Sequence, residues 1–161
     1  MTVHTVRTNS ADDTRNFAAH LGSLLRGGDI ICLIGDLGAG KTTFTQGLGL
    51  GLRLAADDLI NSPTFTILSE HHSGPVPLYH FDVYRLPDAS GLYDLAFDEY
   101  LDGGGVTVIE WADRILAALP NDYLEITFVF MGGTDERLIT LAAHGARSQD
   151  ILAALSNGTP S

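Results

Sequence analysis

Residues 33–44 read LIGDLGAGKTTF, and positions 35–42 within them match the glycine-rich pattern G-x-x-x-x-G-K-[ST]. The apolar run DIICLIG at residues 29–35 leads into the pattern and predicts a buried strand, whereas residues 41–52 predict a helix. A strand, a glycine-rich loop and a helix in this order are the context in which the pattern binds phosphate. The stretch therefore predicts a phosphate-binding loop inside an α/β fold.

The residue types in this loop are suited to binding a nucleoside triphosphate. Glycines allow backbone conformations that a Cβ would forbid, so successive N–H groups can converge on phosphate oxygens, and the following helix adds its positive end. We expect Lys41 to bridge the β- and γ-phosphates, the Thr42 hydroxyl to bind Mg²⁺, and Thr43 to lie on the α-phosphate side. The candidate nucleotide-binding residues of the loop are Asp36, Leu37, Gly38, Ala39, Gly40, Lys41, Thr42 and Thr43.

Two acidic residues at strand ends are candidates for a second protein ligand to Mg²⁺. The run LYHFD ends in Asp82 and the run VTVIE ends in Glu110. Each run would deliver a carboxylate to the nucleotide-binding edge of the sheet. The alternatives are that Glu110 is a surface acid at the start of a helix and that Asp82 only pairs with Arg85.

The remaining patterns predict a mixed sheet. Strands are expected at residues 2–8 and 105–111, and hairpins at residues 61–72 with 78–86 and at 123–130 with 137–143. Helices are expected within residues 9–28, 88–101 and 112–120. We therefore expect one domain over residues 1–161, a P-loop NTPase-like three-layer α/β sandwich with a central sheet of parallel and antiparallel strands. Residues 145–161 are expected to be a short helix in a loosely attached tail.

Composition narrows the range of possible functions further. The formal net charge is −11, with 20 acidic and 9 basic residues, so unaided binding of nucleic acid is not expected. Lys41 is the only lysine, which disfavours a guanine pocket of the N-K-x-D kind and makes ATP the default nucleotide. Cys32, the only cysteine, is expected in the core. With no run of 18 apolar residues and no signal-like N-terminus, we expect a cytoplasmic protein and no membrane partner.

Four blocks together, GDLGAGKTTF, SPTF, LYHFDVYRL and IEWADR, resemble the bacterial TsaE (YjeE) family over residues 10–141. The resemblance implies a slow, partner-modulated P-loop ATPase that works with the TsaB and TsaD proteins in threonylcarbamoylation of adenosine 37 of tRNA. It implies ATP and Mg²⁺ as cofactors, with the metal held by Thr42 and Glu110. The implied catalytic residues are Lys41, Asp82 and Glu110. It also implies a switch over the nucleotide at Ser62 and Thr64 and an adenine contact by Arg137.

Two other functions remain open at this point, as do the places of two side chains. A nucleotide-dependent assembly sensor would bind ATP without essential hydrolysis. A small-molecule kinase usually carries an arginine-rich lid, but Arg114 is the only arginine in residues 86–136. Trp111 could lie beside the nucleotide, in the core or at a partner surface. Arg137 could instead be an exposed hairpin residue.

Overall fold

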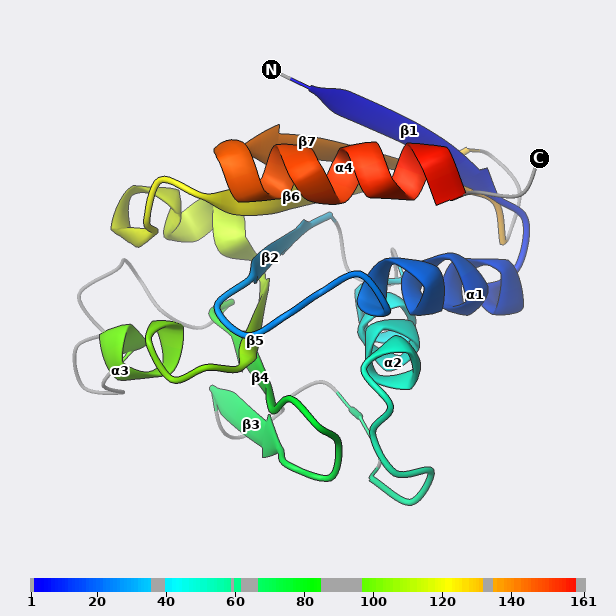
Figure 1. Ribbon diagram of the computed structural model, residues 1–161. Coiled ribbons are helices and arrows are strands. Elements are labelled where there is room, and N and C mark those ends of the chain that lie inside the picture. Colours follow the sequence, from blue (N-terminus) through cyan, green and yellow to red (C-terminus); the bar gives the residue numbers. More distant parts are fainter. Residues whose placement is uncertain are drawn as a thin grey trace.

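The computed structural model describes residues 2–35, 40–58, 60–61, 67–84, 97–131 and 135–158. Within these residues seven strands form one sheet in the order β1-β7-β6-β2-β5-β4-β3 (Figure 1). β6, β2, β5 and β4 are parallel neighbours, while β1, β7 and β3 pair in the antiparallel sense. The predicted mixed sheet is confirmed. The strands are β1 (Val3–Thr8), β2 (Ile30–Ile34), β3 (Leu68–His71), β4 (Leu78–Asp82), β5 (Val106–Glu110), β6 (Tyr123–Phe130) and β7 (Arg137–His144).

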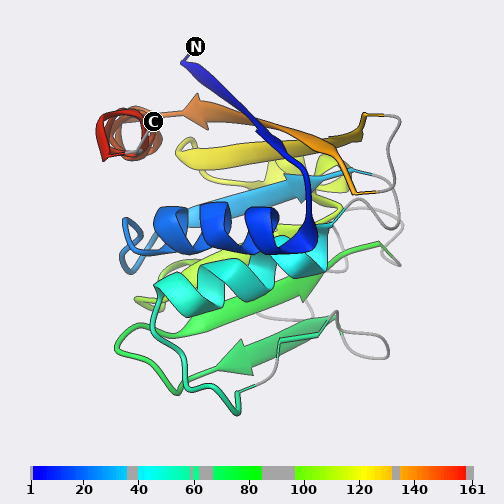
Figure 2. The same cartoon turned by 90° about the vertical axis from the view of Figure 1, so that its right-hand side faces the viewer.

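Helices cover both faces of the sheet, which gives the expected three layers. α1 (Ala11–Gly22) and α2 (Lys41–Gly51) lie on one face, and Figure 2 shows them crossing in front of the strands. α3 (Phe97–Leu101) lies on the other side, together with two 3-10 turns, η2 (Ala112–Arg114) and η3 (Leu116–Ala118) (Figure 1). None of the described helices is both long and apolar enough to cross a membrane.

Side chains that alternate along the central strands contribute to two apolar clusters, one on each face of the sheet. Leu33, Val106 and Val108 point to the α1/α2 face, where they pack with Phe44 and Leu48 of α2. On the opposite face, Cys32, Phe81 and Ile109 pack around Phe97 and Ile115. Cys32 is fully buried, as expected, and burial raises the pKa of its thiol far above the ordinary value. The short apolar runs in the sequence are therefore central strands covered on both sides.

α2 packs closely against α1 because glycines of α2 bring the two helix backbones together. A Cβ built on Gly47 would lie 2.5 Å from the carbonyl oxygen of Arg15 and 2.6 Å from the Cβ of Ala18. A Cβ on Gly51 would lie 2.2 Å from the carbonyl oxygen of Ala19. This contact fixes the helix whose first residue is Lys41.

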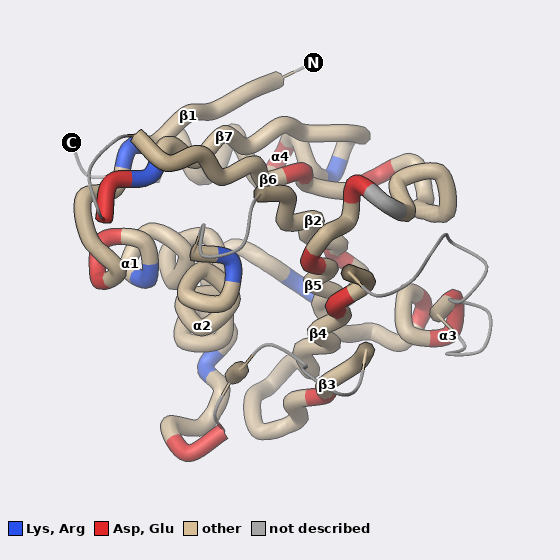
Figure 3. The backbone as a smooth tube through the Cα atoms, turned by 180° about the vertical axis from the view of Figure 1, so that it is seen from behind, with Lys and Arg blue, Asp and Glu red and all other residues tan. Residues whose placement is uncertain are grey.

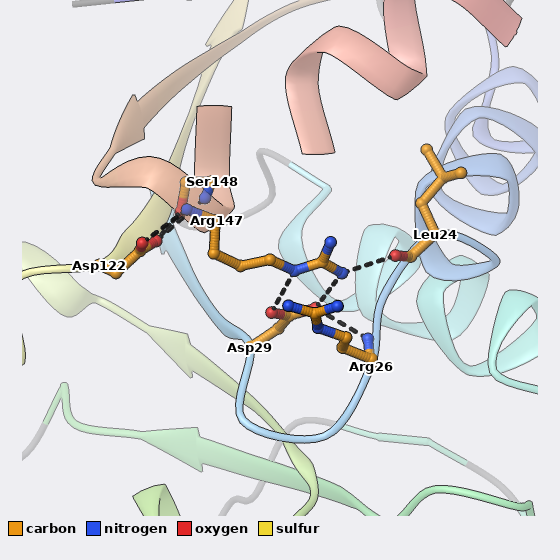
Figure 4. A network of polar contacts seen from close by, with 6 residues as sticks. All are labelled: Leu24, Arg26, Asp29, Asp122, Arg147 and Ser148. Atoms are coloured by element: carbon orange, nitrogen blue, oxygen red, sulfur yellow. Dashed lines mark hydrogen bonds and ion pairs between the residues drawn. The ribbon is translucent and has the colours of Figure 1, made fainter. Parts of the chain in front are cut away.

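The C-terminal segment differs from its prediction. Residues 146–158 form the thirteen-residue helix α4 (Ala146–Gly158), and its Ile151, Leu152 and Leu155 are buried in the α1/α2 cluster. Figure 4 shows the polar contacts at its first turn, where the Arg147 guanidinium donates to both carboxylate oxygens of Asp29, each at 2.9 Å. The expected loose attachment of residues 145–161 is therefore wrong for the part that the structure describes.

Two further predictions need correction or lie partly outside the described residues. Residues 112–120 do not form one helix, because Ile115 separates η2 from η3 with φ −133° and ψ 18° while its side chain is buried in the α3-side cluster. Of the helix predicted at residues 88–101, the structure describes α3, whereas residues 88–96 lie outside the described residues.

Candidate nucleotide-binding site

The two described ends of the glycine-rich loop meet through Lys41. Gly35 follows β2, and Gly40 precedes α2 with φ 101°, a left-handed conformation that favours glycine. The Lys41 ammonium donates a 2.7 Å hydrogen bond to the carbonyl oxygen of Gly35, and the residue is 5% exposed. The only lysine of the chain is therefore held across the mouth of the loop. Thr42 and Thr43 follow in the first turn of α2, and both are partly exposed.

The two candidate acids end neighbouring strands. The parallel register of β4 and β5 places Asp82 opposite Glu110, and the register of β5 with β2 places Glu110 opposite Leu33, two residues before Gly35. Both carboxylates follow the alternation of Leu78, Val106 and Val108, so they lie on the α2 face of the sheet. Glu110 is 2% exposed, which excludes the alternative of a surface acid.

Asp82 is half-buried and lies within the electrostatic field of the other site residues. Burial raises the pKa of Asp82 above its ordinary value, and the Glu110 carboxylate adds to this effect. A backbone hydrogen bond from Tyr84 and the charge of Lys41 oppose the rise without cancelling it. Arg85, the alternative partner of Asp82, lies outside the described residues.

Trp111 lies beside Lys41 and also packs against the α3-side apolar cluster. The Lys41 Nζ lies 3.3 Å from the centroid of the indole ring, and the Tyr84 ring contacts the same indole at a centroid distance of 4.7 Å. Trp111 has φ 63°, an uncommon backbone conformation for a bulky residue. The backbone N–H of Trp111 donates to the carbonyl oxygen of Leu33 at 3.0 Å, which holds the turn after β5 against the end of β2.

Arg137 reaches the same edge from the β6–β7 hairpin. Its guanidinium carbon lies 4.0 Å over the Phe130 ring, and its Nε lies 3.9 Å from a Cβ built on Gly40. Arg137 is partly buried, unlike the exposed hairpin arginine of the alternative interpretation. The Arg137 side chain thus lies beside the start of α2.

Some predicted site residues cannot be placed. Asp36, Leu37, Gly38 and Ala39 of the loop, and Ser62 and Thr64 of the predicted switch, lie outside the described residues. The structure brings together the others, namely Gly40, Lys41, Thr42, Thr43, Asp82, Glu110 and Arg137, at the edge where β2, β4 and β5 end.

The donor set at this edge fits a magnesium ion that is shared with phosphate. Among the described residues, no group of three or more His, Cys, Asp or Glu side chains could hold a metal ion by itself. Mg²⁺ in nucleotide sites commonly takes one or two protein oxygens and completes its shell with water and phosphate. Thr42 at the start of α2 and Glu110 at the end of β5 supply a hydroxyl and a carboxylate of this kind.

Sequence reasoning missed His80. The residue is fully buried on β4, and its Nε2 lies 2.5 Å from Oε2 of Glu110. The signal was present in the sequence, since His80 precedes Asp82 by two residues and side chains at this spacing share one face of a strand.

Comparisons with known proteins agree with this architecture. Residues 8–139 match the family model described as threonylcarbamoyl adenosine biosynthesis protein TsaE. The chain is 45% identical to the tRNA threonylcarbamoyladenosine biosynthesis protein TsaE of Bacillus subtilis, an alignment that covers 93% of this chain and 92% of the relative. It is 36% identical to the protein of the same name from a Nostoc species, over 88% of this chain and 87% of that one.

A solved structure has the same fold. The crystal structure of Bacillus subtilis YdiB superposes with a TM-score of 0.82 at 39% identity, covering 97% of this chain and 95% of the other. The family model spans most of the described sheet, from the end of β1 into β7. On this evidence the chain belongs to the TsaE family.

Proposed function

We propose that this chain takes part in threonylcarbamoylation of tRNA as a Mg²⁺-dependent P-loop ATPase that acts on partner proteins rather than on a metabolite. Membership of the TsaE family supports a role in this pathway, because the family model and the relatives are named for threonylcarbamoyladenosine biosynthesis. The partners proposed from the family resemblance are TsaB and TsaD, and the modified base is adenosine 37. The acidic composition supports a chain that contacts protein and leaves tRNA to those partners.

One observation supports the ATPase proposal above all others. Lys41 at the start of α2, Glu110 at the end of β5 and Asp82 at the end of β4 share one face and one edge of the sheet. In the proposed reaction, Lys41 leaves the Gly35 carbonyl and contacts the β- and γ-phosphates, where its charge offsets the charge that develops during transfer. Thr42 and Glu110 would hold Mg²⁺, which would supply positive charge to stabilise the phosphates during transfer.

Asp82 is proposed to act as a base toward the attacking water. It ends the strand next to Glu110, and its raised pKa makes it a stronger base than an ordinary exposed aspartate. Arg137 is proposed to contact the adenine base, since its guanidinium already stacks on Phe130 beside Gly40. Ser62 and Thr64 are retained as proposed switch residues from the family resemblance.

Reconstitution of the modification tests the proposal. Wild-type chain or Lys41→Ala is combined with purified TsaB, TsaD, tRNA, ATP and the threonylcarbamoyl donor, and the modified nucleoside is measured by mass spectrometry. We expect modification with the wild type and loss with K41A. Leu50→Ala is the matched control, because Leu50 lies on the same helix and is 61% exposed. Modification by K41A at the wild-type rate would contradict the proposal.

A second comparison separates hydrolysis from assembly. Asp82→Asn and Glu110→Gln keep the size of each side chain but remove its charge. If hydrolysis is needed, both variants bind ATP, fail to hydrolyse it and fail to support modification. Full modification by a variant that binds ATP but does not hydrolyse it would favour the assembly sensor. Acceptor-dependent release of ADP without partner proteins would favour a small-molecule kinase, which the family match weighs against.

A further inference from the structure

His80 and Glu110 form a buried pair that the proposed function does not yet use. His80 is fully buried and Glu110 is 2% exposed. His80 lies opposite Val108 in the β4–β5 register, so it is diagonal to Glu110, two residues farther along β5. From there its Nε2 reaches Oε2 of Glu110 at 2.5 Å. The two side chains are therefore directly hydrogen-bonded.

The surroundings of the ring indicate which nitrogen carries the proton. His80 Nδ1 has no hydrogen-bond partner among the described residues, and it is buried. A neutral imidazole with its hydrogen on Nε2 donates that hydrogen to Glu110 and leaves only a lone pair at Nδ1. A hydrogen on Nδ1 would instead be a buried donor with no acceptor, which is unfavourable. The arrangement therefore makes Nε2–H of His80 the donor to the Glu110 carboxylate.

We propose that His80 is a positioning residue, which holds the Glu110 carboxylate in the orientation needed to bind Mg²⁺ at the nucleotide site. The proposal rests on the proposed function, in which Glu110 is a metal ligand. Carboxylates that bind metals are commonly oriented by a hydrogen bond from a second residue, and loss of that residue lowers metal affinity. His80 belongs to a central strand and is fully buried, so packing fixes the orientation of its ring.

Two amide variants of different length test the positioning. Gln can place its amide nitrogen near the position of histidine Nε2, whereas the amide of Asn ends near the position of Nδ1. The measurement is the affinity for ADP by titration calorimetry, once with Mg²⁺ and once with EDTA. We expect His80→Asn to lower the apparent affinity for Mg²⁺ by about 10- to 100-fold while binding of ADP in EDTA stays at the wild-type level. His80→Gln is expected to restore most of the Mg²⁺ dependence.

A second buried histidine provides the matched control. His71 is 7% exposed on β3, and its Nδ1 lies 2.7 Å from Oδ1 of Asp58. It pairs with Leu78 at the start of β4, at the opposite end of that strand from Asp82. His71→Gln, whose amide nitrogen ends beyond the position of Nδ1, disrupts this part-buried histidine–carboxylate pair away from the site, and we expect it to leave the Mg²⁺ dependence of ADP binding unchanged. Melting temperatures of all variants show whether each one is folded.

The outcomes separate this inference from the proposed function. If Glu110→Gln loses the Mg²⁺ dependence and H80N keeps it, the positioning role is wrong and the metal site stands. If H80N and H80Q lose it equally, or if H80N also loses ADP binding in EDTA, His80 is structural and the inference fails. If the wild type itself shows no Mg²⁺ dependence, the proposed function fails first and the inference fails with it.

Discussion

Lys41 and Trp111 make a contact whose consequence can be measured at a single residue. The ammonium of Lys41 lies 3.3 Å from the centre of the only indole ring in the chain, and this charge interacts with the π electrons. Because the energy of the indole excited state depends on nearby charges, we predict that Lys41→Met changes the emission spectrum of Trp111 in buffer without nucleotide. Steady-state fluorescence of the folded variant checks this.

Arg7→Met is the control for this prediction, since it removes one exposed positive charge on β1. β1 is separated from β5, which leads to Trp111, by β7, β6 and β2. Superimposable spectra of wild type and K41M would mean that Lys41 does not rest on the indole in solution.

At the scale of elements, the α1–α2 contact depends on the absence of side chains. A methyl group at Gly47 would meet the backbone of Arg15 and the Cβ of Ala18, neither of which can swing aside. Overpacking usually costs about 1–3 kcal/mol, and the helix preference of alanine over glycine offsets about 1 kcal/mol of this. Because the obstructing atoms belong to the backbone and to a Cβ, we predict that Gly47→Ala lowers the free energy of unfolding by about 2 kcal/mol, the upper end of the net range. Chemical denaturation measures the difference.

Gly49→Ala is the matched control on the same helix. The nearest atoms to a Cβ at Gly49 are the Cδ1 methyls of Ile60 and Leu54, at 2.5 and 3.1 Å, which end flexible side chains. We expect a smaller loss for G49A than for G47A. A G47A protein as stable as the wild type would show that α1 and α2 can separate without penalty.

The first turn of α4 makes stability depend on pH through Asp122. This carboxylate accepts the backbone N–H groups of Arg147 and Ser148 and the hydroxyl of Ser148. Burial alone would raise the pKa of Asp122, but the hydrogen bonds from Ser148 and Arg147 outweigh it and hold the pKa below the ordinary value. A lowered pKa means that the stabilisation is present above the ordinary aspartate pKa and is lost as pH falls through the folded value.

We therefore predict that Asp122→Asn lowers the free energy of unfolding by about 1 kcal/mol at pH 7, as expected for loss of a helix cap. The difference from wild type should shrink as pH falls from 3.8, the ordinary value, through the lower pKa of the folded state, because protonation of Asp122 removes the charge that its hydrogen bonds stabilise. Urea denaturation at several pH values checks this. The control is Asp57→Asn, which alters an exposed aspartate. A constant difference at all pH values would contradict the assignment.

The elements that could be predicted from the sequence are those whose pattern is local. The apolar runs that become β2 and β5 carry their own evidence of burial, and the strand-end rule found Asp82 and Glu110 because parallel strands end at one edge. The predictions that failed concern segments whose structure depends on residues far away in the sequence. Arg147 contacts Asp29 from far along the chain, and burial of Ile115 interrupts a helical pattern in residues 112–120. His80 was missed because a histidine in an apolar run could equally be a core residue.

At the scale of the whole molecule, net charge is the property that bears most directly on tRNA binding. The formal net charge is −11, and Figure 3 shows the described Lys and Arg positions spread over several elements rather than gathered on one face. Binding of RNA depends on contacts between Lys or Arg and phosphates, and each such contact releases counterions. In the part of the chain that the structure describes, the arginines are scattered and do not form one surface that could make many of these contacts together.

We therefore predict that the isolated chain does not bind tRNA at physiological salt, whereas tRNA recruits it when the proposed partners are present. Fluorescence anisotropy of end-labelled tRNA is measured against increasing concentrations of the chain, with and without TsaB and TsaD. Binding by the chain alone that weakens steeply with salt would reveal a phosphate-binding surface and contradict the prediction, since that slope counts the phosphates contacted. Repeating the partner titration with K41A then distinguishes nucleotide-controlled docking, which K41A should weaken, from docking that depends on the surface alone.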